Sequence, residues 1–120
     1  MAFSLQEKRQ FPRIQIHAPI RYQIRGEANF ENLICDNISI GGARLISDKI
    51  IPPATILMLE IQLLSRTFKA IGKIAWACNL THSYRAQLGI QFIEVDPNQE
   101  KFLTDFIEMK LFNNQNGKEQ

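Results

Sequence analysis

The most constraining feature of this chain is a nearly unbroken alternation of apolar and polar residues from Ile14 to Ile24. A two-residue repeat places successive side chains on opposite faces of an extended strand. Pro19 falls on the polar face, where the missing backbone amide is tolerated at an edge or a bulge. The segment is therefore predicted to be a half-buried antiparallel strand. Its predicted inner face consists of Ile14, Ile16, Ala18, Ile20, Tyr22 and Ile24.

Five further segments have the composition of strands, with glycine and proline breaks between them. They cover about residues 30–38, 43–47, 55–64, 67–77 and 85–92. The alternation in the last two places Phe68, Trp76 and Phe92 on the inner face. Six strands at this spacing predict a small antiparallel β-barrel, because closure removes unpaired sheet edges.

One helix is predicted after the strands, near residues 97–112. Asp96 suits the N-cap, Pro97 suits the first helical position, and Gln99 follows three residues after the cap. The fold class is therefore all-β with one C-terminal helix, and residues 113–120 are expected to form a polar, frayed tail. The helix is expected to cover one side of the barrel through Phe102, Leu103, Phe106, Ile107 and Met109.

The length of 120 residues fits one domain. No segment is apolar enough for a signal peptide or a membrane span, so a cytoplasmic location is expected. The net charge is only +2, but residues 1–25 hold five basic side chains and one acid, Glu7. This asymmetry indicates either an anionic partner near the N-terminus or a solvated basic arm.

Catalytic and metal chemistry find little support in the sequence. Cys35 and Cys78 have no CxxC partner, and each is expected to be a small buried hydrophobe. His17 and His82 lack the spacing of metal ligands. There is no nucleophile elbow, P-loop or dinucleotide fingerprint. We therefore expect neither an enzyme nor a resident cofactor.

Two short patterns lie on either side of the first predicted strand: Arg9-Gln10-Phe11-Pro12-Arg13 and Asn37-Ile38-Ser39-Ile40-Gly41-Gly42. Together they resemble the PilZ domain, a bacterial receptor for cyclic di-GMP with the signatures RxxxR and [D/N]xSxxG. The resemblance runs from about Lys8 to Phe112. Gly72-Lys73-Ile74-Ala75-Trp76 is similar to the family's G-x-V-x-W strand, and Leu88-Gly89-Ile90-Gln91-Phe92 to its G-x-x-F strand. The resemblance implies the same fold, a six-stranded barrel with one C-terminal helix.

The resemblance assigns ligand binding to Arg9, Arg13, Asn37, Ser39 and Gly42. A guanidinium group can fork onto phosphate oxygens or onto guanine O6 and N7, both of which cyclic di-GMP offers. Asn37 and Ser39 share one face of a strand and can bond a purine edge, while Gly42 lets the base approach the backbone. The alternative is a polar strand end whose side chains bond locally around a Gly-Gly turn, with positive φ angles open to the glycines.

A second group of residues is weighed as further ligand contacts. Lys8 stands where many family members have another arginine, which leaves open whether one ligand or an intercalated pair binds. Gln10, Gly41 and Arg44 are suggested by their proximity to the motifs. The alternation favours Trp76 in the core, and stacking on a guanine is the other possibility.

The resemblance implies a single-domain cyclic di-GMP receptor acting in motility or biofilm control through an unidentified effector protein. Residues 1–13 are expected to form a flexible basic arm that orders over bound ligand. One alternative is a PilZ-like adaptor in type IV pilus assembly that binds no nucleotide. Another is a single-stranded nucleic-acid binder, which needs exposed aromatic rings. The aromatic rings of the predicted strands fall on inward-facing positions, which disfavours binding of single-stranded nucleic acid. Neither a nucleic-acid polymer nor a membrane is expected as a partner.

Overall fold

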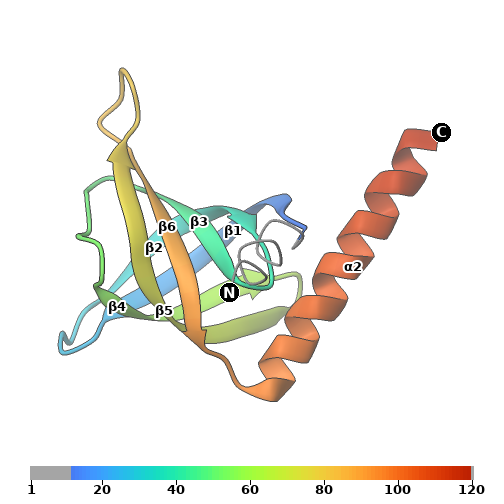
Figure 1. Ribbon diagram of the computed structural model, residues 1–120, viewed down its shortest axis with the longest axis horizontal. Helices are drawn as coiled ribbons and strands as arrows, with labels where there is room; N and C mark the ends of the chain where they lie inside the picture. The colour runs from blue at the N-terminus through green and yellow to red at the C-terminus, as the bar shows by residue number, and fades with distance from the viewer. Residues whose placement is uncertain (1–11, 120) are drawn as a thin grey trace, which may run out of the picture.

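The computed structural model of the protein describes residues 12–119, which contain six strands and one helix. The strands close into an antiparallel barrel in the order β1-β2-β3-β6-β5-β4, which confirms the predicted fold class (Figure 1). The elements are β1 (Ile14–Ile24), β2 (Phe30–Ile38), β3 (Gly42–Ser47), β4 (Ile56–Leu63), β5 (Arg66–Asn79), β6 (Ala86–Glu94) and α2 (Pro97–Glu119).

The alternation in β1 produces the predicted inner face. Ile14, Ala18, Ile20 and Tyr22 are buried, whereas Pro19 is exposed. The barrel interior is filled in the same way by alternate residues of the other strands, among them Phe68, which packs against Phe92 with ring centroids 5.3 Å apart. Burial of these apolar side chains is the main source of stability for the barrel.

Helix α2 covers a place where two neighbouring strands diverge. β1 pairs with β4 only over Ile20–Ile24, so the first half of β1 has no pairing with β4. Leu103, Phe106 and Ile107 of α2 are buried against the core on this side. In Figure 1 the helix follows β6 and runs along one side of the barrel, and its C-terminal end lies away from the strands. No helix in residues 12–119 is both long enough and apolar enough to cross a membrane.

The start of α2 is the predicted one, but its end is not. The amide of Asn98 donates to Oδ1 of Asp96 at 2.9 Å, which makes Asp96 the N-cap. The helix then continues to Glu119, where the sequence predicted a frayed tail from residue 113. No proline follows Pro97 and the first later glycine is Gly117, so no residue in between stops the helix.

A bulge in β5 overturns two predictions about side-chain direction. Ile74 pairs with Ile90 but Trp76 pairs with Gly89, so the register shifts between them. An extra residue on one strand reverses the inward and outward phases beyond it. Trp76 is 44% exposed and not in the core, and Cys78 is exposed and not buried.

Candidate functional site

A hollow of about 360 Å³ lies at one end of the barrel, where four separate segments of the chain meet. Arg13 precedes β1, and Ser39, Gly41 and Gly42 come from the turn that joins β2 to β3. The other wall is formed by the neighbouring strands β5 and β6, and includes Trp76 from β5. Both sequence motifs therefore contribute to one hollow, and Trp76 contributes to the same hollow.

Arg13 and Asn37 connect the two motifs directly. Nε of Arg13 donates a hydrogen bond to Oδ1 of Asn37 at 2.6 Å. The register explains the contact, because Ile14 pairs with Ile38 and Gln15 with Asn37 across β1 and β2. A guanidinium group has five N–H donors, and this bond uses one of them. Asn37 therefore orients Arg13, while the terminal nitrogens of Arg13 can still bind an anion or a base.

Ser39 has a local role in the turn. Its side chain is buried, its amide donates to the carbonyl of Gly42 at 2.8 Å, and its Oγ accepts from the amide of Gly41 at 3.3 Å. β2 ends at Ile38, so the prediction that Ser39 continues the strand beside Asn37 is wrong. The reason is that the Ser39 amide turns to close the loop on Gly42. Ser39 thus bonds locally, as the alternative interpretation of this motif proposed.

Gly42 is required for a close approach between strands. A β-carbon on Gly42 would lie 2.1 Å from the carbonyl oxygen of Ile90, which is far inside van der Waals contact. The turn is also tied to β6 by the amide of Phe92, which donates to the carbonyl of Gly41 at 2.9 Å. Among the described glycines only Gly26 has a positive φ, so the turn does not use the positive φ angles that were open to Gly41 and Gly42.

Trp76 forms the aromatic wall of the hollow. A β-carbon on Gly89 would lie 2.1 Å from Nε1 of Trp76, so the indole packs directly over the Gly89 backbone. One part of the ring is thereby supported by β6, and the rest stays exposed to the hollow. The glycine in the middle of β6 was the sequence signal for this contact, because a strand glycine often marks a close approach.

Arg44 forms an ion pair with Asp36 and does not face the hollow. Its Nε and Nη2 donate to the two carboxylate oxygens of Asp36 at 3.0 and 3.2 Å. This hydrogen bonding raises the pKa of Arg44 and holds its side chain beside Asp36. Arg44 does not line the hollow, so its proximity in sequence to the motif is not matched by a place in the site.

Cys35 contacts the backbone of the Asn37 motif from inside the barrel. It is fully buried, as predicted, and its Sγ donates to the carbonyl of Asn37 at 3.4 Å. Burial raises the pKa of this thiol to about 12, so it stays protonated near neutral pH.

Lys8, Arg9 and Gln10 lie outside the described residues, and the structure does not place them.

The family model for the PilZ domain matches residues 7–109. The chain belongs to the PilZ domain family. This match covers both motifs, the whole barrel and α2 from Pro97 to Met109.

Three comparisons show how this PilZ domain relates to known proteins. An uncharacterised protein of Aquifex aeolicus is 27% identical over 104 residues, which are 84% of this chain and 48% of that protein. The Bacillus subtilis inhibitor of motility MotI/DgrA has a TM-score of 0.77 and 18% identity, over 88% of this chain and 52% of that one. The PilZ domain of Escherichia coli YcgR, solved with c-di-GMP, has a TM-score of 0.70 and 14% identity, over 92% and 96% of the two chains.

The two structural comparisons establish the fold and not more, because their sequence identities are low. The chain spans about half the length of the Aquifex protein and of MotI/DgrA. It spans nearly all of the isolated YcgR PilZ domain.

Proposed function

We propose that this PilZ domain is a receptor for cyclic di-GMP and binds it in the hollow between Arg13 and Trp76. The observation that carries the proposal is the convergence of these two side chains, 63 residues apart in sequence, on a single hollow. Membership of the PilZ family and the likeness to a PilZ domain solved with c-di-GMP support the same ligand.

Each side chain of the hollow suits one part of this ligand. The terminal nitrogens of Arg13 can fork onto a phosphate or onto guanine O6 and N7, and its bond to Asn37 fixes their direction. The indole of Trp76 offers a supported aromatic surface for stacking a guanine. The Gly41-Gly42 turn keeps this side of the hollow free of side chains. Arg9, four residues before Arg13, would supply the second guanidinium.

The proposed output is a contact with an effector protein. Ligand bound to Arg9 and Arg13 would hold residues 1–13 against the barrel and so create a new surface. Control of motility is the favoured pathway, since the similar MotI/DgrA is an inhibitor of motility. In this proposal the domain signals by binding and carries out no reaction of its own.

Calorimetric titration of the full chain with cyclic di-GMP tests the proposal, with GMP and cyclic di-AMP as ligand controls. We expect saturable binding of cyclic di-GMP, and about 30- to 100-fold weaker binding by Arg13→Ala, the loss of roughly 2–3 kcal/mol of charge-assisted bonding. Arg9→Ala should have a comparable effect. Arg25→Ala is the matched control, because Arg25 is exposed beyond the far end of β1.

The same titration distinguishes the receptor from the adaptor that works without nucleotide. Absence of heat and of competition at every ligand concentration would favour the adaptor. Equal affinity of wild type and Arg13→Ala would retain the ligand but move its site away from the hollow.

A further inference from the structure

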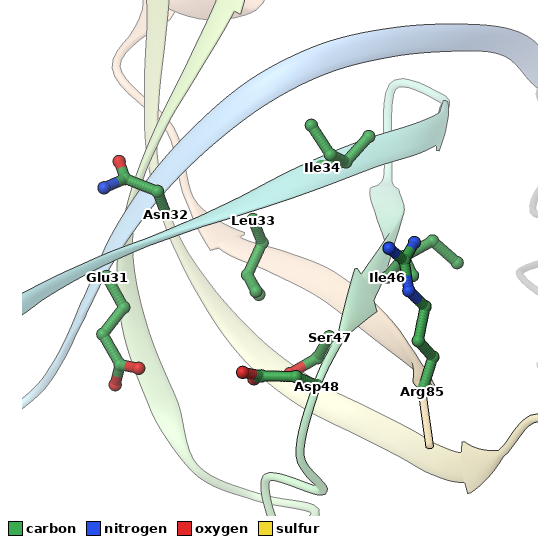
Figure 2. A pocket seen from close by; sticks show the side chains of 8 residues that line it. All are labelled: Glu31, Asn32, Leu33, Ile34, Ile46, Ser47, Asp48 and Arg85. Atoms are coloured by element: carbon green, nitrogen blue, oxygen red, sulfur yellow. The ribbon is translucent and has the colours of Figure 1, made fainter. Parts of the chain in front are cut away.

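The barrel has a second place where neighbouring strands diverge, and α2 does not cover it. β2 pairs with β1 along its whole length but with β3 only over Ile34–Ile38. Residues 30–33 of β2 therefore have a strand partner on one edge only in the described part of the chain. β3 runs on to Ser47 beside β6. Figure 2 shows β2 and β3 separating at this point. We call the gap between residues 31–34 and residues 46–48 the open seam.

The open seam holds a hollow of about 440 Å³, larger than the candidate nucleotide site. The two hollows lie at opposite ends of β3, since Gly42 lines one and Ser47 lines the other. At about 3.4 Å per residue, these ends are about 17 Å apart. An unpaired strand edge presents backbone N–H and C=O groups, which are a template for an added strand.

Two carboxylates face each other across the open seam. In Figure 2 the side chain of Asp48 points toward that of Glu31, while Arg85 places its guanidinium on the other side, beside Ile46. Nζ of Lys49 binds Oε2 of Glu31 at 3.0 Å. An ammonium group therefore already fits against Glu31. Because both side chains of this pair are substantially exposed, the pair is weak and a cation from elsewhere can replace Lys49.

A buried hydroxyl beside these carboxylates lacks a hydrogen-bond partner. Tyr22 lies directly across from Glu31 in the β1–β2 register and is 1% exposed. Its hydroxyl is the buried side-chain polar atom without a partner in the described residues. Burial raises the pKa of Tyr22 to about 12, followed by the charge of Glu31 and its tendency to accept the phenol proton, and then by Asp48 and Glu27, so the phenol is neutral. A neutral phenol oxygen can accept a hydrogen bond from an incoming ammonium or guanidinium group.

We propose that the open seam binds an extended segment of a partner protein, added beside β2, with a lysine or arginine of that segment between Glu31 and Asp48. Strand addition supplies the main-chain hydrogen bonds that residues 30–33 lack on their free edge. The two carboxylates select a basic side chain at one position. The hydroxyl of Tyr22, across from Glu31, is a further acceptor that does not itself line the hollow. Leu33, whose side chain projects from β2 into the open seam, offers an apolar contact (Figure 2).

The test uses the full chain without cyclic di-GMP, so its outcome does not depend on the nucleotide proposal. The probe is a short acetylated peptide that alternates valine and lysine, and the control peptide replaces lysine with glutamate. Amide chemical shifts and hydrogen exchange are followed during titration. We expect shifts at residues 31–34 and 46–48, slower exchange of amides within residues 30–33, and no such changes with the glutamate peptide.

Matched variants identify the side chains that bind. Glu31→Gln and Asp48→Asn should each weaken binding of the lysine peptide about five- to tenfold, the loss of one charge-assisted bond near the surface. Glu94→Gln removes an exposed carboxylate outside the open seam and should change nothing. Lys49→Ala and Arg85→Gln should leave binding equal or make it stronger, because each removes a competing or repelling cation.

Three results would overturn the proposal. Equal binding of the glutamate peptide, or unchanged affinity in both carboxylate variants, would remove the basis for a cationic segment. Shifts confined to the Arg13–Trp76 hollow would place the peptide elsewhere. Self-association of the chain in sedimentation, abolished by Glu31→Gln, would make a second copy the occupant.

Discussion

The guanidinium of Arg13 donates a hydrogen bond from Nε to Oδ1 of Asn37 at 2.6 Å, and the two residues are 24 positions apart in sequence. The pair joins the RxxxR motif to the N-x-S-x-x-G motif, so the two patterns form one structural unit. Asn37 then acts on ligand binding through Arg13, and the two residues should not contribute independently.

A double-mutant cycle measures this coupling. Arg13→Ala and Asn37→Ala should each weaken cyclic di-GMP binding, and the double variant should lose less than the sum of the two single losses. We expect a coupling energy of about 1–2 kcal/mol, within the range for residues in contact. Calorimetry gives the four affinities. Strict additivity would mean that Asn37 binds the ligand without help from Arg13.

Trp76 should contribute to ligand binding and little to stability. Removing an aromatic stacking surface costs about 1–3 kcal/mol per base, so Trp76→Ala should weaken binding about 5- to 150-fold. Trp76→Phe should retain part of the affinity. Tyr84→Ala is the control, because Tyr84 is 99% exposed and does not line the hollow.

Loss of stability without loss of affinity in Trp76→Ala would mean that the indole only packs over Gly89 and does not bind the ligand. Urea unfolding of the same variant supplies this measurement.

Gly42 should be a position of high sensitivity to added volume. Its substituent would meet the backbone carbonyl of Ile90, which cannot move without shifting β6. Gly42→Ala should therefore lower the free energy of unfolding by about 2–3 kcal/mol, as overpacking does. The control Ser65→Ala lies in an exposed turn and should stay within about 0.5 kcal/mol of wild type. A neutral result at Gly42 would show that the turn relaxes easily.

The barrel could be predicted from the sequence, because strand and helix signals are local. The binding residues of the two motifs were predicted from the resemblance to the PilZ domain. Alternation placed β1 correctly, and Asp96 with Pro97 placed the start of α2. The direction of Trp76 could not be predicted, since a single inserted residue at the bulge reverses the phase and leaves the composition unchanged. The point at which β2 separates from β3 could not be predicted either, because the pairing depends on both strands together and the pattern of one strand does not determine it.

Alkaline conditions should destabilise the fold through Tyr22. Its pKa is raised from 10.0 to about 12 in the folded state, so the folded protein retains the proton that the unfolded chain releases. The stabilisation is complete below pH 10 and is lost as pH rises to about 12. Unfolding free energies measured across this range should fall by on the order of 2 kcal/mol from this group.

Cys35 contributes in the same direction, because burial raises its pKa from 9.0 to about 12. Tyr22→Phe and Cys35→Ala should each flatten the alkaline slope, and together they should remove most of it. A slope unchanged in both variants would assign alkaline unfolding to other groups.

The proposed switch is the ordering of residues 1–13 on the ligand. Arg13 lines the hollow, and Arg9 precedes it by four residues in the sequence, so in this proposal Arg9 would bind the same ligand. Hydrogen exchange around residues 5–13 should slow when cyclic di-GMP binds, because these amides become part of the closed site. Arg9→Ala should bind more weakly and should also lose this added protection at saturating ligand. GMP, which offers one guanine and one phosphate, should protect residues near Arg13 but not those near Arg9. Protection that is already complete in the free protein would mean that the arm is preformed, and that the signal passes to the partner by another route.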